Sequence, residues 1–378
     1  MDQVALARLG NQSIFEAVSQ VVDLVGGIDK YVKKGDLVLI KPNSFILARP
    51  ETGFITHPEV VLAIAKLCHK RGARVVVGER RRNIFTNFQD YPEINDYAEL
   101  ISFDEAPLKL KTIPGAKALY MSIAIPRIVD ECDVFINVPG LRTHALTDMS
   151  NGLKNVMGIL PDNSTRLVHD LGLTDSIVDL NLARPSDLIV SDAIYSVQGN
   201  FPAGGEMIQT NFLMASTNMV AIDVVAATIM GFDPSAVEHI NEAAARGLGP
   251  ATLDEIKVVG SSLDSVRFTP QRADHDYGKY KDRLDITDGA ACKGCRQSLA
   301  SAIAAAAAEI GEEQIRDLRI ITGPVETLPA GPRDRVLMYG SCTRRFKDQG
   351  TFIPGCPPLA GQGKKFIVKL CGKRKEME

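Results

Sequence analysis

The 378-residue sequence lacks a long hydrophobic run, a secretory start and a strong excess of charge of either sign. No segment approaches the ~18 uninterrupted apolar residues of a membrane-spanning helix, so no membrane insertion is expected. The first residues show no basic start leading into an apolar run, which predicts a cytoplasmic protein. The formal net charge of −3 gives no general attraction to nucleic acid or to a membrane surface.

Several familiar functional motifs are also missing. The chain has no Walker A loop, no nucleophile elbow and no dinucleotide fingerprint. It has no C-x2-C-x2-C-x3-C run of the bacterial ferredoxin type and no recognisable flavin motif. Any function has to be argued from other clusters of residues, and an unidentified second cofactor stays possible.

Strand and helix signals alternate through most of the chain. Apolar runs at 37–40, 73–78, 134–138 and 188–191 predict buried strands, and amphipathic segments between them predict helices. The pairs Ser13/Glu16 and Thr56/Glu59 have capping-box spacing at two helix starts. Apolar strands separated by amphipathic helices predict an α/β fold, with a mostly parallel sheet and helices on both of its faces.

Composition divides the chain into parts. Residues 1–268 carry the α/β pattern, residues 269–285 form a polar linker, and residues 286–378 form a smaller C-terminal α/β domain. This last part holds 15 Lys and Arg against 10 Asp and Glu, whereas the rest of the chain is acidic. The positive charge is either an ordinary solvated surface, or it offsets an anionic cluster and docks an acidic electron-transfer protein.

Four of the seven cysteines cluster by spacing in the C-terminal domain. Cys292 and Cys295 are separated by two residues, Cys342 follows after 46 residues, and Cys356 after 13 more. The first pair precedes a predicted helix at 297–310, and glycines stand close before the last two cysteines. Such glycines let the backbone approach inorganic sulfide and donate N–H groups to it. The pattern favours an iron–sulfur cluster of the [4Fe–4S] type on these four cysteines.

Three other interpretations of the cysteines remain open. Four cysteines can hold zinc, although the C-x13-C half is poor zinc spacing. The CKGC sequence fits a redox dithiol, which leaves Cys342 and Cys356 unexplained. In the third interpretation, the four cysteines are unrelated structural residues. Cys371 lies in a lysine-rich tail and is interpreted as a bystander.

A second cluster of polar residues lies in the α/β domain. Histidine and lysine candidates for acid–base work are joined by arginine and asparagine candidates for holding a carboxylate or phosphate. The candidate catalytic residues are His144, His169 and Lys154, and the candidate substrate-binding residues are Lys41, Asn43, Arg142, Asn155, Arg166 and Asn200. Several of them follow predicted parallel strands, at the edge where α/β sheets bind ligands. The alternative is a solvated loop with ordinary polar residues.

Stretches of the α/β domain resemble the domain of unknown function 362 family. The matching sequences are LVLIKPN (37–43), THPEVV (56–61), VFINVPGLRTH (134–144), SNGLKNVMGIL (150–160), Arg166 with His169, SDAIYSVQGNFPAGG (191–205) and NMVAIDVVAATIMGFDP (218–234). The resemblance implies an association with iron–sulfur clusters and no established reaction. Family members commonly have lysine where this chain has Arg142. The GCPP ending of the cysteine module is similar to cluster-binding subunits of hydrogenase-like redox complexes.

Together these features predict an iron–sulfur oxidoreductase. Its basic C-terminal domain passes single electrons, and its α/β domain holds a small anionic molecule. Two alternatives stay open. One is a non-enzymatic electron carrier or cluster-bearing partner of a larger redox complex. The other is a hydrolase or transferase with a structural metal site.

Overall fold

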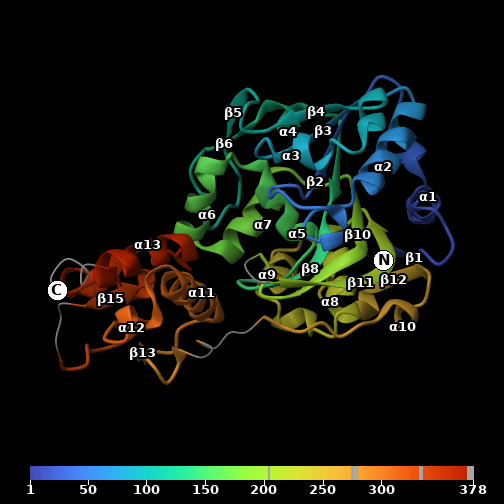
Figure 1. Ribbon diagram of the computed structural model, residues 1–378. Helices are drawn as coiled ribbons and strands as arrows, with labels where there is room; N and C mark the ends of the chain where they lie inside the picture. Colours follow the sequence, from blue (N-terminus) through green and yellow to red (C-terminus); the bar gives the residue numbers. More distant parts are fainter. Residues whose placement is uncertain (203–204, 274–276, 278–279, 332–334, 373–378) are drawn as a thin grey trace. The chain divides into compact units, whose positions relative to one another are not determined.

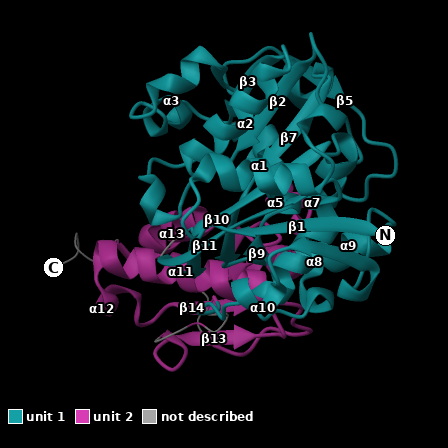
Figure 2. Ribbon diagram, turned by 90° about the vertical axis from the view of Figure 1, so that its right-hand side faces the viewer, with its two compact units in different colours: residues 1–165, 174–272 teal, residues 166–173, 273–378 magenta. Residues whose placement is uncertain are grey.

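The computed structural model describes residues 1–378 except 203–204, 274–276, 278–279, 332–334 and 373–378, and except the side chains of Asn163 and Arg166. The chain divides into two compact units, one of residues 1–165 and 174–272 and the other of residues 166–173 and 273–378 (Figure 2). Neither unit is continuous in sequence, because residues 166–173 leave the first and belong to the second. Parts of the predicted linker 269–285 lie outside the described residues.

The first unit, the α/β unit, is built on one large mixed sheet (Figure 1). The strand order among the described residues is β12-β1-β11-β10-β7-β2-β3-β4, with β8 and β9 attached beside β10. The strands are β1 (Asp2–Arg8), β2 (Leu37–Pro42), β3 (Arg74–Glu79), β4 (Glu99–Ser102), β7 (Val134–Val138), β8 (Gly140–His144), β9 (Asp148–Ser150), β10 (Leu188–Gly199), β11 (Gly205–Ser216) and β12 (Ile256–Gly260). A separate antiparallel pair consists of β5 (Leu108–Lys111) and β6 (Ile123–Pro126).

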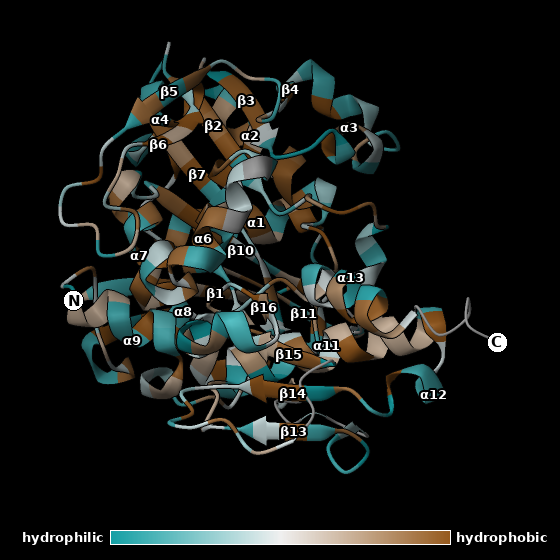
Figure 3. Ribbon diagram, turned by 90° about the vertical axis from the view of Figure 1, so that its left-hand side faces the viewer, coloured by the Kyte–Doolittle hydropathy of each residue, from teal (hydrophilic) through white to brown (hydrophobic). Residues whose placement is uncertain are grey.

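The centre of this sheet is parallel, as the apolar runs predict. Strands β10, β7, β2, β3 and β4 pair in parallel, and β11 pairs antiparallel with both β10 and β1. Strand β7 is buried along its whole length, and β2, β3 and β7 are coloured as hydrophobic in Figure 3. When both faces of a strand are covered, neither face contacts solvent, so the sequence of the strand is a continuous apolar run. The predicted mostly parallel α/β sheet is confirmed.

Helices of the α/β unit pack their apolar sides into the core. The helices are α1 (Ile14–Leu24), α2 (Pro58–Lys70), α3 (Asn83–Asn87), α4 (Arg127–Glu131), α5 (Gly152–Asn155), α7 (Leu173–Ala183), α8 (Met219–Ile229), α9 (Glu238–Ala245) and α10 (Leu263–Val266). Short 3₁₀ segments lie at Ile28–Lys30, Pro50–Thr52, Pro92–Asp96, Val156–Ile159, Asp162–Ser164, Pro234–Ala236 and Leu253–Glu255. Helices α1 and α2 pack against each other, and their buried residues share one core cluster with β2, β3 and β7.

One of the two predicted capping boxes forms and the other does not. Ser13 caps α1 and Glu16 bonds back to it, as predicted. The box predicted at Thr56 and Glu59 is wrong, because His57 is the N-cap of α2. The Thr56 hydroxyl is used elsewhere: it donates to the carbonyl of Val138 (2.8 Å) and accepts the backbone N–H of Asn43 (2.9 Å).

The second unit, the small unit, has its own parallel sheet. The strand order is β13 (Asp285–Asp288), β14 (Arg319–Thr322), β15 (Val336–Tyr339) and β16 (Thr351–Ile353), and each neighbouring pair is parallel. The unit also contains α11 (Lys293–Ile310), α12 (Glu312–Ile315), α13 (Ala360–Cys371), a 3₁₀ segment at Ser341–Gln349 and most of α6 (Thr165–Leu171). Helix α11 ends at Gly311, as predicted, and packs on α13. Among the described residues no helix combines the length and apolar character needed to cross a membrane.

Replacing Ser13 by alanine should destabilise the α/β unit. The Ser13 hydroxyl accepts the Glu16 backbone N–H, and loss of such a cap costs ~1 kcal/mol. Chemical unfolding followed by circular dichroism measures the change. The control is Ser19→Ala inside the same helix, where alanine has the better helix propensity. Equal stability of the two variants would contradict the capping role.

Candidate functional site

A buried ion pair stands at the carboxyl ends of two neighbouring strands. Lys41 is near the end of β2 and Glu79 ends β3, and their Nζ and Oε2 atoms are 2.9 Å apart. The side chains are only 0% and 1% exposed. Burial lowers the pKa of Lys41, and the charge of Glu79 opposes that shift. The Lys41 amine also donates to the carbonyl of Pro42 (2.9 Å) and to Asn155 Oδ1 (3.5 Å).

Three asparagines extend this ion pair into a network. Asn155 Nδ2 donates to the carbonyl of Lys41 (3.3 Å) and to Asn137 Oδ1 (2.8 Å). Asn155 Oδ1 accepts Asn43 Nδ2 at 3.2 Å. Asn43 Oδ1 in turn accepts Arg142 Nη1 at 2.7 Å. A satisfied buried network of this kind fixes its members in one arrangement.

Gly158 leaves the space that the ion pair occupies. A Cβ atom there would lie 2.5 Å from Lys41 Nζ and 2.6 Å from Glu79 Oε1, closer than real Cβ contacts. Any larger residue would force the two charged groups apart. The glycine of the sequence GIL (158–160) is therefore part of the same network.

Arg142 is held rigidly although it carries a charge in the interior. It is 1% exposed, and its Nε donates to the carbonyl of Gly53 at 2.5 Å. Its guanidinium lies 5.0 Å from the centre of the Phe201 ring. Burial lowers the pKa of Arg142 to about 10, and the charge of Asp192 works against that shift. Its Nη2 is buried and has no partner among the described residues.

Arg80 supplies a second guanidinium. It directly follows β3, its Nη1 donates to the Thr165 hydroxyl, and its guanidinium lies 5.5 Å from the centre of the Phe45 ring. Its side chain is 12% exposed and lies 3.9 Å from the Asp162 carboxylate. The Nε atom is buried and unpaired within the part of the chain that the structure describes.

Lys154 completes a group of three cations. It lies on α5 and is partly buried. No hydrogen bond or ion pair connects its side chain to a described residue. Burial, followed by the charges of Arg80 and Arg142, lowers its pKa to about 7. We call Lys154, Arg80 and Arg142 the cationic triad, whose like charges disfavour one another.

A buried carboxylate positions Lys154 from outside its helix. Helix α5 has no side-chain cap of its own. Asp223 on α8 accepts the backbone N–H groups of Gly152 (2.8 Å) and Leu153 (3.1 Å) at the start of α5. Burial raises the pKa of Asp223 to about 7. Asp223 therefore fixes the turn that carries both Lys154 and Asn155.

The loop after β10 brings an aromatic side chain to Arg142. The Phe201 ring is 3% exposed and has edge contacts with Phe54 at 5.3 Å and with His144 at 6.1 Å between ring centroids. His144 is 5% exposed, and its Nδ1 accepts the Leu146 backbone N–H at 3.0 Å. Asn200 immediately precedes Phe201 in this loop.

The remaining two predicted residues of this cluster belong to the small unit. Arg166 and His169 lie on α6, in the segment that clusters with residues 273–378. The Arg166 side chain lies outside the described residues. The His169 carbonyl accepts the backbone N–H of Cys356 at 2.7 Å, so this helix holds the loop of the last predicted ligand. The predicted substrate-binding set is thus divided between the two units.

All four predicted ligand cysteines follow strands of the small sheet. Cys292 comes after β13 and is the N-cap of α11, and Cys295 lies in the first turn of that helix. Cys342 comes after β15 and Cys356 after β16. Because the strands are parallel, their carboxyl ends meet at one edge of the sheet. One edge therefore presents the complete set.

The other three candidate ligand cysteines act electrostatically on Cys295. The pKa of Cys295 is raised by a hydrogen bond with Cys292, by burial, and by the charges of Cys292, Cys356 and Cys342. Gly340, with φ of 95°, comes close to the Cys295 sulfur: a Cβ there would be 3.1 Å from it. Across the described residues, no three or more His, Cys, Asp or Glu side chains are arranged to hold a metal ion.

The other cysteines are buried in the cores. Cys68 is 0% and Cys132 is 7% exposed. Cys371 is 1% exposed and belongs to the core cluster of the small unit. Burial raises the pKa of the Cys371 thiol, which makes it a poor ligand or nucleophile.

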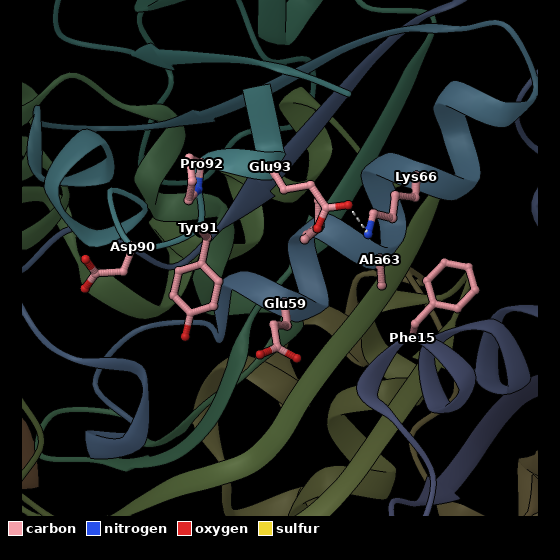
Figure 4. A pocket seen from close by; sticks show the side chains of 9 residues that line it. Phe15, Glu59, Ala63, Lys66, Asp90, Tyr91, Pro92 and Glu93 are labelled. Atoms are coloured by element: carbon pink, nitrogen blue, oxygen red, sulfur yellow. Dashed lines mark ion pairs between the residues drawn. The ribbon is translucent and has the colours of Figure 1, made fainter. Parts of the chain in front are cut away.

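A separate pocket of about 370 Å³ opens on the α/β unit beside α1 and α2 (Figure 4). Phe15, Glu59, Tyr91 and the ion pair between Lys66 and Glu93 (2.7 Å) contribute to its lining. None of the cationic triad lines it. It is therefore distinct from the candidate site.

Sequence reasoning missed Arg80, Asp223 and Phe201 as members of the site. Arg80 stands in a GER sequence directly after β3, at the carboxyl end of the strand next to β2, which carries Lys41 near its own end. Phe201 lies inside the GNFPAGG loop that holds Asn200. Asp223 carries no local signal, because its partners are about seventy residues away along the chain.

Replacing Glu79 by glutamine should strongly destabilise the α/β unit. The change leaves the Lys41 ammonium buried without its counter-charge, a loss of about 3–5 kcal/mol. The control is Glu99→Gln, which removes an exposed ion pair with Arg74 and should change stability by ~0–1 kcal/mol. Urea unfolding of both variants compares them. Similar losses would mean that the buried pair contributes no more than a surface pair.

Comparison with known proteins identifies the family of this chain. The model of the family described as domain of unknown function (DUF362) matches residues 38–228. The thylakoid-associated protein sll1697 of Synechocystis sp. is 28% identical over 252 residues, which is 64% of this chain and 78% of that protein.

Two solved structures show weaker likeness. The lactate racemase apoprotein of Thermoanaerobacterium thermosaccharolyticum matches with a TM-score of 0.39 and 13% identity, over 62% of this chain and 58% of that chain. A precorrin-6y C5,15-methyltransferase of Geobacter metallireducens matches with a TM-score of 0.24 and 10% identity, over 54% and 87%. The family match covers half of the sequence and includes Lys41, Arg142 and Lys154. The chain belongs to the DUF362 family.

Proposed function

We propose that this protein is an iron–sulfur oxidoreductase that exchanges electrons with a small anionic molecule. Cys292, Cys295, Cys342 and Cys356 would hold one [4Fe–4S] cluster, and the cationic triad would hold the anion. The proposal depends mainly on one observation about the Lys154 amine. This amine interacts electrostatically with two guanidinium groups and has no partner among the described residues.

The anion is favoured by charge and by hydrogen-bond capacity. Arg80 and Arg142 each keep a buried nitrogen without a partner in the described part of the chain. Unsatisfied buried donors cost free energy, and a carboxylate or phosphate oxygen satisfies them with charge-assisted hydrogen bonds. The hydrogen bonds that hold the two arginines in place use other nitrogen atoms, so binding of the ligand would not break them. His144, whose Nδ1 already accepts a hydrogen bond, would carry its proton on Nε2 and serve as a proton donor.

The cluster is supported by where the cysteines stand. When bound, a [4Fe–4S] cluster supplies one-electron transfer at a potential set by hydrogen bonds and burial. Cys292 and Cys295 lie at the N-terminus of α11, where the helix dipole favours thiolates. His169 would steady the loop of Cys356 through its carbonyl.

An acidic electron-transfer protein is the partner we propose for the small unit. Basic residues adjoin the cysteines in sequence, among them Lys293 and Arg296 beside the first pair and Arg344 after Cys342. Opposite charge accelerates the encounter of such partners. We place the reaction in the cytoplasm. The relative from Synechocystis is named thylakoid-associated, which describes that protein.

Anaerobically purified protein should contain about four irons and four acid-labile sulfides per chain, as expected for one [4Fe–4S] cluster. Cys342→Ser should lose them. Cys371→Ser is the matched control, since Cys371 is buried in the core and should leave the iron content unchanged. Iron, sulfide and zinc assays are run together. One zinc per chain without sulfide would replace the cluster by a structural metal.

Anion binding should weaken as the pH rises through 7. The Lys154 pKa of about 7 means that the triad loses one positive charge between pH 6 and 8, and the affinity for oxalate, whose own charge is constant over this range, falls with it. Lys154→Met should remove this dependence and lower affinity about tenfold at pH 6, whereas Lys70→Met at the exposed end of α2 should not. Calorimetry measures both. An equal affinity of wild type and Lys154→Met would remove the triad from the binding site.

A further inference from the structure

Lys154 differs from the other buried lysine of the α/β unit in what its amine contacts. Lys41 donates to a carboxylate, a carbonyl and an amide oxygen, and its side chain is fully buried. Lys154 has no such contacts among the described residues. An amine without hydrogen-bond partners keeps its lone pair available when it is deprotonated.

The surroundings of Lys154 favour the deprotonated amine at neutral pH. An ordinary lysine is neutral in roughly one molecule in 2,500 at pH 7, because its pKa is near 10.4. Burial, followed by the charges of the Arg80 and Arg142 guanidinium groups, lowers the pKa of Lys154 to about 7. Desolvation and a neighbouring cation are the two means by which enzymes activate a lysine as a nucleophile.

The two arginines also provide a place for a carboxylate beside this amine. Arg142 is fixed by the Gly53 carbonyl and Asn43, and Arg80 by the Thr165 hydroxyl. Arg142 Nη2 and Arg80 Nε remain as donors. Because both guanidinium groups act electrostatically on the Lys154 amine, a carboxylate held by them would lie near that amine, and so would the atom bonded to the carboxylate. In a 2-oxo acid, that atom is the electrophilic carbonyl carbon.

We propose that Lys154 forms an imine with a 2-oxo acid whose carboxylate is bound by Arg80 and Arg142. The proposal rests on the anion site proposed above and names its ligand class. The amine nitrogen attacks the carbonyl carbon, and a C=N bond forms. The C–O bond breaks, and the oxygen leaves as water with the two amine protons. The step is redox-neutral and needs no further reactant.

Reductive trapping tests the imine. The purified protein, with whatever cluster it carries, is incubated anaerobically with pyruvate and sodium cyanoborohydride, digested and analysed by mass spectrometry. We expect one adduct, with the mass of pyruvate plus two hydrogens less one water, on the peptide that contains Lys154. Labelling should be on the order of 10²–10³-fold faster than at exposed Lys70, in line with the neutral fractions of the two amines. Lactate, which lacks the carbonyl, should give none.

Variants separate the covalent step from anion binding. Lys154→Arg keeps a positive charge and should bind pyruvate within a few-fold of wild type, but should give no adduct. Lys70→Arg should label like wild type. Lys41 should stay unlabelled because its amine is occupied. Circular dichroism tests whether the variants are folded. The peptide map of the wild-type protein identifies the labelled lysine without any variant.

Each remaining outcome overturns a defined claim. Calorimetric binding of pyruvate without any trapped adduct overturns the imine and leaves the anion site standing. Adducts spread over surface lysines at the rate of Lys70 also overturn the imine. If neither pyruvate nor phosphate binds and pyruvate gives no adduct, the imine and the proposed function are both overturned.

Discussion

The buried ion pair of Lys41 and Glu79 is the interaction on which the α/β site depends. Two charges removed from water are tolerable only when each is the other's partner and their other hydrogen-bonding atoms are satisfied. That requirement explains the amide network around the pair and the glycine at 158 that makes room for it. The network then reaches Arg142 through Asn43 and fixes a third charge.

Distant parts of the sequence position the reactive groups. Asp223 holds the start of α5, and with it Lys154, by accepting two backbone N–H groups. Phe201 supports the guanidinium of Arg142 from the loop after β10. The Lys154 amine has no partner among the described residues, and its pKa is set by burial and then by the charges of Arg80 and Arg142.

The features that could be predicted from the sequence are those determined by residues close together in the chain. Buried parallel strands appear as apolar runs, and the Ser13 cap appears as a four-residue pattern, so both could be predicted. The Thr56 cap was wrong because a tertiary bond to the Val138 carbonyl outcompetes the local one. Asp223 was missed because its role comes from partners far along the chain. Arg166 and His169 follow Lys154 closely in sequence, yet the fold assigns them to the small unit.

The discontinuity of the two units has a consequence for biosynthesis. Residues 166–173 belong to the small unit, but the chain completes the α/β unit through residue 272 before it makes the rest of that small unit. At ribosomal rates of about 5–20 residues per second, the segment waits roughly 5–20 s for its partner. During that interval, residues 166–173 lack the rest of the unit to which they belong in the folded protein. Assembly of the small unit therefore waits for the last quarter of translation, although one of its segments is made before the middle of the chain.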